Sequence, residues 1–436
     1  MEKNFLKCLF IGGMSFAFFI VSLFINLVVS ERSELSEQTQ QEISQSWSNQ
    51  QNFLGPTICV PVVKDTVNST MPYTCMYILP DRYEIAADVE SEILHRGIFD
   101  ASVYRTKVNG TGTFNLKDMM MSGMMKGSNS PVRFDWQHAQ IIASISDKRG
   151  LEEGMKVSIQ DITCELNSRF YNYGNERLRP VSDFGQEPVC CMLDLSPLVG
   201  KDTVSFTINS EIKGSSSLYI APIGQNSVIT LGGNCTDPSF EGMMLPSSRS
   251  VTPDGFTATW KVSSLNLKDV EQVFYSHAGI SEFEYVGAKL LVKGGQYTQT
   301  DRALKYAFLV ILLSLAAVYV AEMCVKCEIS ALNYLLIGAA LVIFYLLLLS
   351  FGEWIGFAAA YAVSALLVLG MITMYLKAIV QNQRVALAVC LFMALVDVFI
   401  YVLLSIDSMA LLIGTLGLFI ILGVAMFFSL RLKKQK

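Results

Sequence analysis

The residue with the most unusual chemical setting is Asp397, the only charged residue in the apolar run 385–404. A charged carboxylate at the centre of a membrane-spanning helix costs about 3 kcal/mol, so Asp397 must face other helices or water. It is either a proton or ion site, or a protonated or hydrogen-bonded acid that fixes helix packing. The sequence leaves both readings open, because no partner base is visible at the same depth.

A methionine-rich run offers a second set of candidate ligands. Its members are Met119, Met120, Met121, Met124 and Met125. Thioethers are soft ligands that select Cu(I), but clustered methionines also serve as adaptable packing or as a sticky surface near lipid. We predict no bound metal or other cofactor and keep the methionines as a weak copper candidate.

Cysteine and histidine spacing does not indicate a catalytic or metal centre. Six cysteines lie in the polar middle of the chain: Cys59, Cys75, Cys164, Cys190, Cys191 and Cys235. Six cysteines allow 15 connectivities; we predict one disulfide, Cys59 with Cys75, against the alternative that several are free and buried. Cys324 and Cys327 form a lone Cys-x-x-Cys, and the three histidines have no metal-ligand spacing. A non-enzymatic protein is the prediction.

The segments that must position Asp397 are membrane helices. Hydrophobic residues make up 52% of the 436 residues and charged residues only 16%, whereas about 25% charged is usual for soluble proteins. A span needs about 20 apolar residues. Six runs qualify: 5–29, 303–321, 332–350, 355–376, 385–404 and 409–430. The first is too long for a cleaved signal peptide, so we expect a retained anchor.

Charge distribution orients the six predicted helices. Nine Lys and Arg residues flank the spans on one predicted side: Lys3, Lys7, Lys326, Lys377, Arg384, Arg431, Lys433, Lys434 and Lys436. By the positive-inside rule both termini are cytoplasmic and residues 31–301 lie outside. The acids Glu353 and Asp407 fall in the outer loops. Arg302 and Lys305 lie at the outer start of the second span. Arg302, Lys305 and Glu353 are therefore candidate interfacial residues, the two cations facing lipid headgroups.

The outer segment is acidic and follows the pattern of a β protein. Residues 31–301 hold 22 Lys and Arg against 32 Asp and Glu, which disfavours nucleic acid as a partner. Tyr83, Ile85, Ala87 and Val89 alternate with polar residues, as in a half-buried strand, and Asn109-Gly110 is a hairpin turn signal. We expect a large, mainly β domain, as a β-sandwich or two smaller units.

The predicted organisation is thus an α-helical polytopic membrane protein of six transmembrane helices, with a mainly β domain inserted between helices 1 and 2. The predicted domains are residues 1–30 for the N-terminal helix, 31–56 for a juxtamembrane helical stalk, 57–301 for the β domain and 302–436 for a five-helix bundle with a basic tail. The stalk is expected to end near Gly55-Pro56.

Several motifs resemble the CreD family of bacterial inner-membrane proteins, described as cell envelope integrity proteins. They are Thr300-Asp301-Arg302-Ala303-Leu304-Lys305-Tyr306, Tyr334-Leu335-Leu336-Ile337-Gly338, Phe344-Tyr345-Leu346-Leu347-Leu348-Leu349, Tyr375-Leu376-Lys377-Ala378 and Asp407-Ser408-Met409-Ala410-Leu411-Leu412-Ile413-Gly414. Asp397 also falls where that family has an acid. The resemblance implies an inner-membrane protein with a periplasmic domain, associated with envelope integrity, envelope stress and colicin tolerance. It brings no catalytic residues, and the methionines and cysteines are outside it.

Three functions therefore stay open. The first is a non-enzymatic envelope protein whose β domain binds an envelope protein or glycan while the helices contact membrane lipids. The second is a transporter or ion-coupled protein that uses Asp397. The third is a lipid- or glycan-modifying enzyme at the outer membrane face, for which the sequence displays no acid–base cluster.

Overall fold

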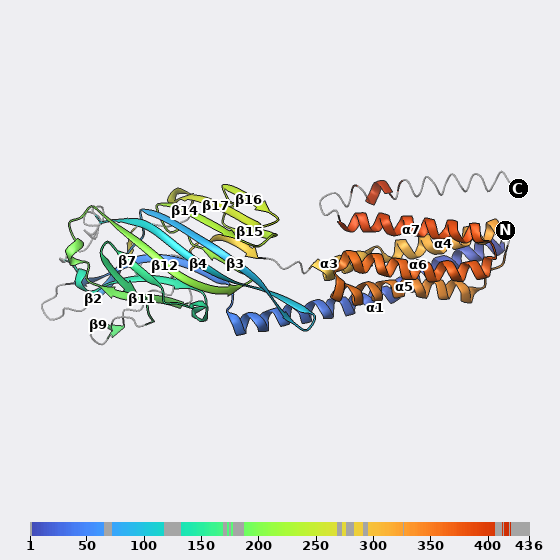
Figure 1. The fold of residues 1–436 in the computed structure, drawn as a ribbon, viewed down its shortest axis with the longest axis horizontal. Coiled ribbons are helices and arrows are strands. Elements are labelled where there is room, and N and C mark those ends of the chain that lie inside the picture. Colours follow the sequence, from blue (N-terminus) through green and yellow to red (C-terminus); the bar gives the residue numbers. More distant parts are fainter. Residues whose placement is uncertain are drawn as a thin grey trace. The chain divides into compact units, whose positions relative to one another are not determined.

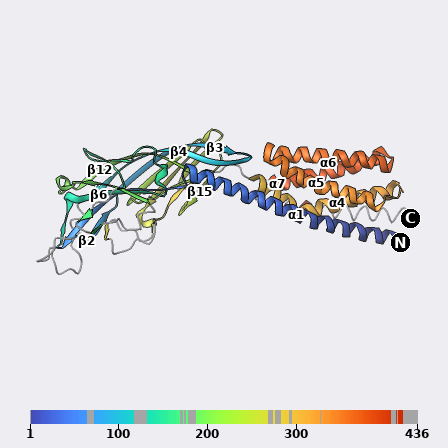
Figure 2. The same cartoon turned by 90° about the horizontal axis from the view of Figure 1, so that it is seen from below.

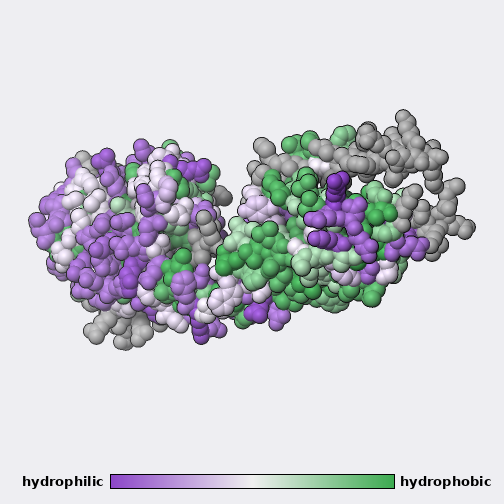
Figure 3. All heavy atoms as spheres, turned by 45° about the vertical axis from the view of Figure 1, so that its right-hand side comes forward, coloured by the Kyte–Doolittle hydropathy of each residue, from purple (hydrophilic) through white to green (hydrophobic). Residues whose placement is uncertain are grey.

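The computed structural model describes residues 2–64, 72–116, 132–168, 172–173, 176–177, 187–267, 273–275, 283–290, 295–325, 327–405, 412, 414–417 and 419. The chain divides into two compact units. The helical unit comprises Met1–Glu37 and Lys293–Lys436, and the β unit comprises Gln38–Val292. Hydrophilic residues cover the β unit, and hydrophobic residues cover much of the helical unit (Figure 3).

Helices build the helical unit (Figure 1). They are α1 (Glu2–Trp47), α3 (Gly295–Lys305), α4 (Ala307–Val325), α5 (Ala331–Ile355), α6 (Phe357–Val380) and α7 (Gln383–Ser405). Five of the described helices, all except α3, are long and apolar enough to cross a membrane. Five of the six predicted spans are thereby confirmed as candidates, and the described residues of the sixth, 412, 414–417 and 419, are helical.

Two helix boundaries differ slightly from the predicted ones. The predicted second span starts within α3, and the chain breaks at Tyr306 before α4. The break between the third and fourth spans falls at Gly356, whose φ of 76° lies in the left-handed region that favours glycine. Gly356 ends α5 and begins α6, so this single residue connects the two helices without a polar loop.

One sheet of the β unit has eight strands. In spatial order these are β16 (Ser248–Thr252), β17 (Gly255–Ser263), β14 (Asn226–Gly233), β3 (Arg82–Arg96), β4 (Phe99–Asn115), β12 (Thr203–Ser215), β7 (Lys156–Ile159) and β8 (Ile162–Glu165). Neighbours are antiparallel except β14 and β3, which are parallel.

The other large sheet has nine strands. Its main path is β11 (Glu187–Leu193), β6 (Ala139–Ile145), β1 (Gln51–Lys64), β13 (Ser217–Ile220), β19 (Val286–Leu290) and β15 (Pro238–Gly242). β2 (Pro72–Ile78) and β5 (Val132–Phe134) also pair with β1, and β18 (Val273–Tyr275) pairs with β2. The remaining elements are the pair β9 (Asn172–Tyr173) and β10 (Glu176–Arg177), and the short helices η1 (Trp136–His138), η2 (Lys148–Gly150), η3 (Ser196–Leu198) and η4 (Ser264–Asn266).

The two large sheets form the layers of a sandwich around one hydrophobic core (Figure 2). The period-two pattern of β3 is confirmed, because Tyr83, Ile85, Ala87 and Val89 are all buried while their neighbours are exposed. Every residue of β6 is buried, so the nine-stranded sheet is covered on both of its faces there. The eight-stranded sheet therefore keeps one face open to solvent, and the nine-stranded sheet lies deeper in the unit.

Two local predictions are wrong. Asn109-Gly110 lies inside the long strand β4, and the hairpin turn is at Gly97, which has a φ of 66°. The helical stalk ends at Trp47, earlier than Gly55-Pro56, and β1 begins at Gln51. Gly55 and Pro56 instead sit where the register of β1 against β6 shifts, an irregularity that a strand accommodates with such residues.

Candidate functional sites

Asp397 lies on α7 beside an aromatic cluster from α5, α6 and α7. The Tyr361 hydroxyl donates to the backbone carbonyl of Asp397 at 2.9 Å. The rings of Tyr361 and Tyr401 are 5.3 Å apart, as are those of Tyr361 and Phe344. The side chain of Asp397 itself is partly exposed. It accepts no hydrogen bond from any residue that the structure describes.

A second polar cluster, which the sequence analysis missed, lies at one end of the helical unit. The buried carboxylate of Glu322 on α4 forms an ion pair with Lys7 of α1. It also accepts hydrogen bonds from the Tyr334 hydroxyl at 2.8 Å and from the backbone N–H of Ile329 at 3.3 Å. Glu322 therefore lies at a buried junction of α1, α4 and α5.

The opposite end of the unit holds the three interfacial candidates. Glu353 accepts a hydrogen bond from the Tyr297 hydroxyl at 3.2 Å, and its carboxylate lies 4.0 Å from Arg32. Lys305 pairs with Asp301 at 2.7 Å. Arg302 is half-buried on α3. Glu353 thus joins α5 to α3 and α1, whereas the Lys305–Asp301 pair lies within α3 and leaves Lys305 exposed.

The two polar clusters mark the ends of the apolar layer. Lys7 and Arg32 are 25 residues apart, which corresponds to about 38 Å along a helix that rises about 1.5 Å per residue. The hydrocarbon core of a bilayer is about 30 Å thick. A membrane thus fits between the clusters, and the N-terminal end of α1 lies at the same end as the α4–α5 connection, as alternating spans require.

The β unit presents an exposed polar sheet surface, here called the open face. Its exposed side chains come from β3, β4, β12 and β17: Glu84, Asp88, Glu90, Arg105, Lys107, Asn109, Thr111, Ser205, Thr207, Asn209, Thr257 and Lys261. The cross-strand register places Asn109 opposite Asn209 and Thr111 opposite Thr207. Lys107 forms an ion pair with Glu211 at 3.5 Å. The open face thus combines hydroxyl and amide groups with charges of both signs.

Trp47, the last residue of α1, is held against the eight-stranded sheet. The cations of Arg105 and Lys213 lie 4.9 and 5.3 Å from the centre of its ring. Attraction between a cation and an aromatic face is worth about 0.5–1 kcal/mol at exposed sites. Arg105 also binds the Glu152 carboxylate through its Nε at 3.1 and 3.2 Å. A pocket of about 250 Å³ beside Trp47 is lined mainly by polar side chains, including Glu90, Glu92 and Asn234.

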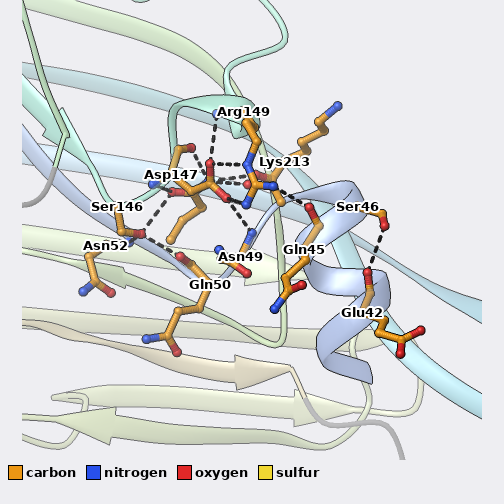
Figure 4. A network of polar contacts seen from close by, with 12 residues as sticks. Glu42, Gln45, Ser46, Asn49, Gln50, Asn52, Ser146, Asp147, Arg149 and Lys213 are labelled. Carbon is orange, nitrogen blue, oxygen red and sulfur yellow. Dashed lines mark hydrogen bonds and ion pairs between the residues drawn. The ribbon is translucent and has the colours of Figure 1, made fainter. Parts of the chain in front are cut away.

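A polar network fixes the turn from α1 into β1 (Figure 4). Asp147 lies at its centre and accepts hydrogen bonds from the Arg149 guanidinium at 2.6 and 2.9 Å and from the Asn49 backbone N–H at 3.0 Å. The buried Gln51 side-chain amide donates to the backbone carbonyls of Asp147 and Lys213. The Arg149 side chain lowers the pKa of Asp147 to about 2.

This lowered pKa predicts an acid-sensitive contribution to stability. Because the folded-state pKa of Asp147 lies below that of the unfolded chain, about 3.9, the contribution is full above pH 4 and is lost as the pH falls to about 2. We expect Asp147→Asn to lower the free energy of unfolding by about 2 kcal/mol at pH 7 and by almost nothing at pH 2. Chemical denaturation at several pH values measures this difference. Asp161→Asn, at an exposed turn, is the control, and an equal loss at both pH values would contradict the prediction.

The cysteine pairing differs from the predicted one. The structure joins Cys164 of β8 to Cys191 of β11, which links the two large sheets, and leaves Cys59 and Cys75 as free buried thiols. Cys59 lies opposite Tyr77 and Cys75 opposite Pro61, so the two cysteines are diagonal neighbours on β1 and β2. Diagonal positions are farther apart than the Cβ spacing of about 3.8 Å that a disulfide needs. The Cys59 thiol is hydrogen-bonded to Cys75, and this bond together with burial raises its pKa.

The observed disulfide gives a second stability prediction. Cys164 and Cys191 are separated by 27 residues, and closing a loop of this size stabilises a fold by about 3.5 kcal/mol in the chain-entropy model. Replacing both cysteines by alanine should lower the free energy of unfolding of the β unit by this amount without reductant. Reductant should destabilise the wild type but leave the double variant unchanged. Equal sensitivity of the two proteins to reductant would contradict the assignment.

The other sequence candidates do not form a site among the described residues. Met119, Met120, Met121, Met124 and Met125 lie outside the described residues, as does His277. Cys324 is exposed and Cys327 is partly buried. His95 pairs with Asp100 and His138 with Asp135. In the part of the chain that the structure describes, no three His, Cys, Asp or Glu side chains are grouped to hold a metal ion.

Known proteins match this chain over nearly its whole length. A sequence model of the family described as inner membrane protein CreD matches residues 3–434. The inner membrane protein CreD of Escherichia coli strain K12 is 27% identical to this chain over 417 residues, which cover 93% of this chain and 88% of that protein. The match thus spans both the helical unit and the β unit.

Proposed function

Because this chain belongs to the CreD family of inner membrane proteins, we propose that it supports the integrity of the bacterial cell envelope without acting as an enzyme. In this proposal the helical unit anchors the protein in the inner membrane with both termini in the cytoplasm. The β unit lies in the periplasm and binds a component of the envelope, either a protein or a glycan. The nine basic residues that flank the spans on one side support this orientation.

The observation that carries the proposal is the open face of the β unit. A sheet of eight strands would usually bury one face and solvate the other, so exposure alone is unremarkable. This face, however, is broad, and its central rows carry uncharged hydrogen-bonding groups such as Asn109, Asn209 and Thr207. Such groups suit a hydrated partner that is rich in hydroxyl or amide groups. The mixed charges around them add specificity more than affinity.

The enzyme alternative finds less support in the geometry. A lipid- or glycan-modifying enzyme needs an acid–base pair free to act at the outer membrane face. Asp301 is engaged by Asn26 and Lys305, and Glu353 by Tyr297 and Arg32. Acids held in this way stabilise helix contacts and are poorly placed to exchange protons with a substrate.

Complementation in a strain that lacks the protein tests the proposal. The double variant Thr207→Arg with Asn209→Arg introduces two bulky charges onto the open face. Leu265→Arg places one such charge at an exposed site outside the open face. We expect the double variant to reach the membrane at normal levels but to lose tolerance to envelope stress and colicins, and the Leu265 variant to keep it. Full complementation by a well-folded double variant would overturn the role of the open face.

The transport alternative is tested in the same assay. If Asp397→Asn keeps full complementation while a helical unit without residues 57–292 loses it, the function resides in the β unit. Loss of complementation by Asp397→Asn alone would favour an ion-coupled function.

A further inference from the structure

The pocket beside Trp47 lies at one end of the open face. Its lining includes Glu90 and Glu92 of β3, Arg105 of β4, Asn234 beyond β14 and Trp47 of α1. Glu90 is directly opposite Arg105 in the strand register, so the pocket continues the exposed rows of β3 and β4. Its volume of about 250 Å³ is slightly below the range of about 300–1,000 Å³ that is usual for drug-sized ligands. The pocket therefore suits a single ring or side chain.

Hydrogen bonds and cation contacts hold the walls of the pocket in place. The Asn234 side-chain oxygen accepts from the Ser91 backbone N–H at 2.7 Å and from the Ser91 hydroxyl at 2.6 Å. The Asn234 side-chain nitrogen donates to the Ser91 carbonyl at 3.1 Å. The cations of Arg105 and Lys213 lie beside the Trp47 ring. Because these walls are already ordered, a ligand that enters the pocket pays little for ordering them.

The charges in the pocket favour an uncharged ligand. The side chains of Glu90 and Glu92 are exposed, and neither forms an ion pair within the part of the chain that the structure describes. Arg105 binds Glu152 through its Nε, which leaves its terminal nitrogens to donate to a ligand. A cation would be repelled by Arg105, and an anion would be repelled by the two carboxylates. A hydroxyl group suits both, because it donates to a carboxylate and accepts from a guanidinium.

The exposed row of β4 extends the pocket toward the centre of the open face. This row continues from Arg105 through Lys107 to Asn109, about 13 Å away at a rise of about 3.3 Å per residue. Asn109 lies opposite Asn209 of β12, so two side-chain amides meet there. A ligand longer than one ring can therefore lie in the pocket and reach these amides.

We propose that the pocket and the exposed row of β4 bind an uncharged, N-acetylated glycan chain, with one sugar ring in the pocket. The inference rests on the proposed function and deepens it, because it selects a glycan over a protein as the partner of the open face. Hydroxyl groups of the bound ring donate to the Glu90 and Glu92 carboxylates and accept from the Arg105 guanidinium, and such charge-assisted hydrogen bonds are the stronger kind. The next rings lie along β4, where the Asn109 amide pairs with an acetamido group.

Isothermal titration calorimetry of the full-length protein in lipid nanodiscs tests this inference with oligomers of N-acetylglucosamine. These probes carry hydroxyl, ether and acetamido groups and no charge. We expect the tetramer to bind at least about tenfold more tightly than the monomer, because it adds hydrogen bonds beyond the pocket.

Two double variants separate the pocket from a general effect of charge. Glu90→Gln with Glu92→Gln should weaken binding of the tetramer by at least about tenfold, because hydrogen bonds to charged acceptors are replaced by weaker ones. Asp161→Asn with Asp254→Asn also removes two negative charges, at exposed turns outside the open face, and should leave binding unchanged.

Three results would overturn the inference. The wild type could fail to bind the tetramer, or the two double variants could weaken binding equally. Alternatively, the wild type could bind pentalysine at low salt and ignore the tetramer, which would identify a basic protein as the partner. If the tetramer does not bind while the Thr207 and Asn209 double arginine variant still loses complementation, the glycan is wrong and the role of the open face stands.

Discussion

Replacing Lys7 by methionine should lower the free energy of unfolding of the helical unit by about 3–5 kcal/mol. The Glu322 side chain is only 7% exposed, whereas that of Lys7 is 30% exposed. Without Lys7, the buried carboxylate keeps, among the described residues, the Tyr334 hydroxyl and the Ile329 N–H as partners. Denaturation with SDS in mixed micelles, followed by circular dichroism, measures the loss.

A double variant separates the ion pair from the packing of the two side chains. Replacing both Lys7 and Glu322 by methionine removes the charge together with its partner, so it should restore at least half of the loss. Lys305→Met, which removes one member of a more exposed pair, should have a smaller effect, below about 1 kcal/mol. A double variant no more stable than Lys7→Met would show that packing, and not the unpaired charge, sets the cost.

Trp260→Ala should destabilise the β unit by a similar amount, about 3–5 kcal/mol. Trp260 on β17 is fully buried, and its ring packs against Phe240 of β15, at a centroid distance of 6.0 Å. Its Nε1 donates to the backbone carbonyl of Met244 at 3.1 Å. The side chain therefore joins the two sheets, and its removal leaves a cavity between them. Urea denaturation followed by the β-sheet circular dichroism signal measures the effect.

Two neighbouring substitutions serve as controls for Trp260→Ala. Trp260→Phe keeps most of the apolar contact and loses the hydrogen bond, so it should cost about 1–2 kcal/mol. Lys261→Ala alters the next residue, which points to solvent, and should change stability by less than about 0.5 kcal/mol. Equal effects of Trp260→Ala and Lys261→Ala would contradict the proposed position of the core.

Features that depend on local sequence were predictable. The alternation of Tyr83, Ile85, Ala87 and Val89 identified the buried face of β3, because a strand points successive side chains to opposite faces. The apolar runs located the membrane helices, since each run satisfies the length of a span by itself. Asp397 could be singled out for the same reason, as its neighbours in the chain define its depth.

Features that depend on tertiary neighbours were not predictable in this way. Asn109-Gly110 has the composition of a turn, but both residues lie within β4. A glycine occupies position 110 because Ile85 and Ile208 of the adjoining strands fill the space that a side chain would need. A Cβ at Gly110 would come within 2.2 Å of Ile85 Cδ1 and 2.6 Å of Ile208 Cγ2. Glycine here serves close packing, a role that looks identical to a turn residue in the sequence.

The partners of the polar residues were also hidden. Lys7 and Glu322 are 315 residues apart, and their contact requires α1 to pack beside α4. The sequence carried one signal for this contact, because Lys7 lies at the predicted cytoplasmic end of the first span and Glu322 directly follows the predicted second span, 303–321. The Cys164–Cys191 bond likewise joins strands of different sheets, so spacing along the chain could not select it.

Site-specific photocrosslinking in living cells tests the central claim most directly. A photoreactive amino acid at Thr207 or Asn209 places the probe on the open face, and the same residue at Leu265 provides a matched exposed control. Mass spectrometry of the products should identify a periplasmic protein or glycan that is linked at Thr207 and Asn209 but not at Leu265. Absence of any product specific to the open face, from a probe that crosslinks efficiently elsewhere in the protein, would contradict the claim that this surface binds an envelope component.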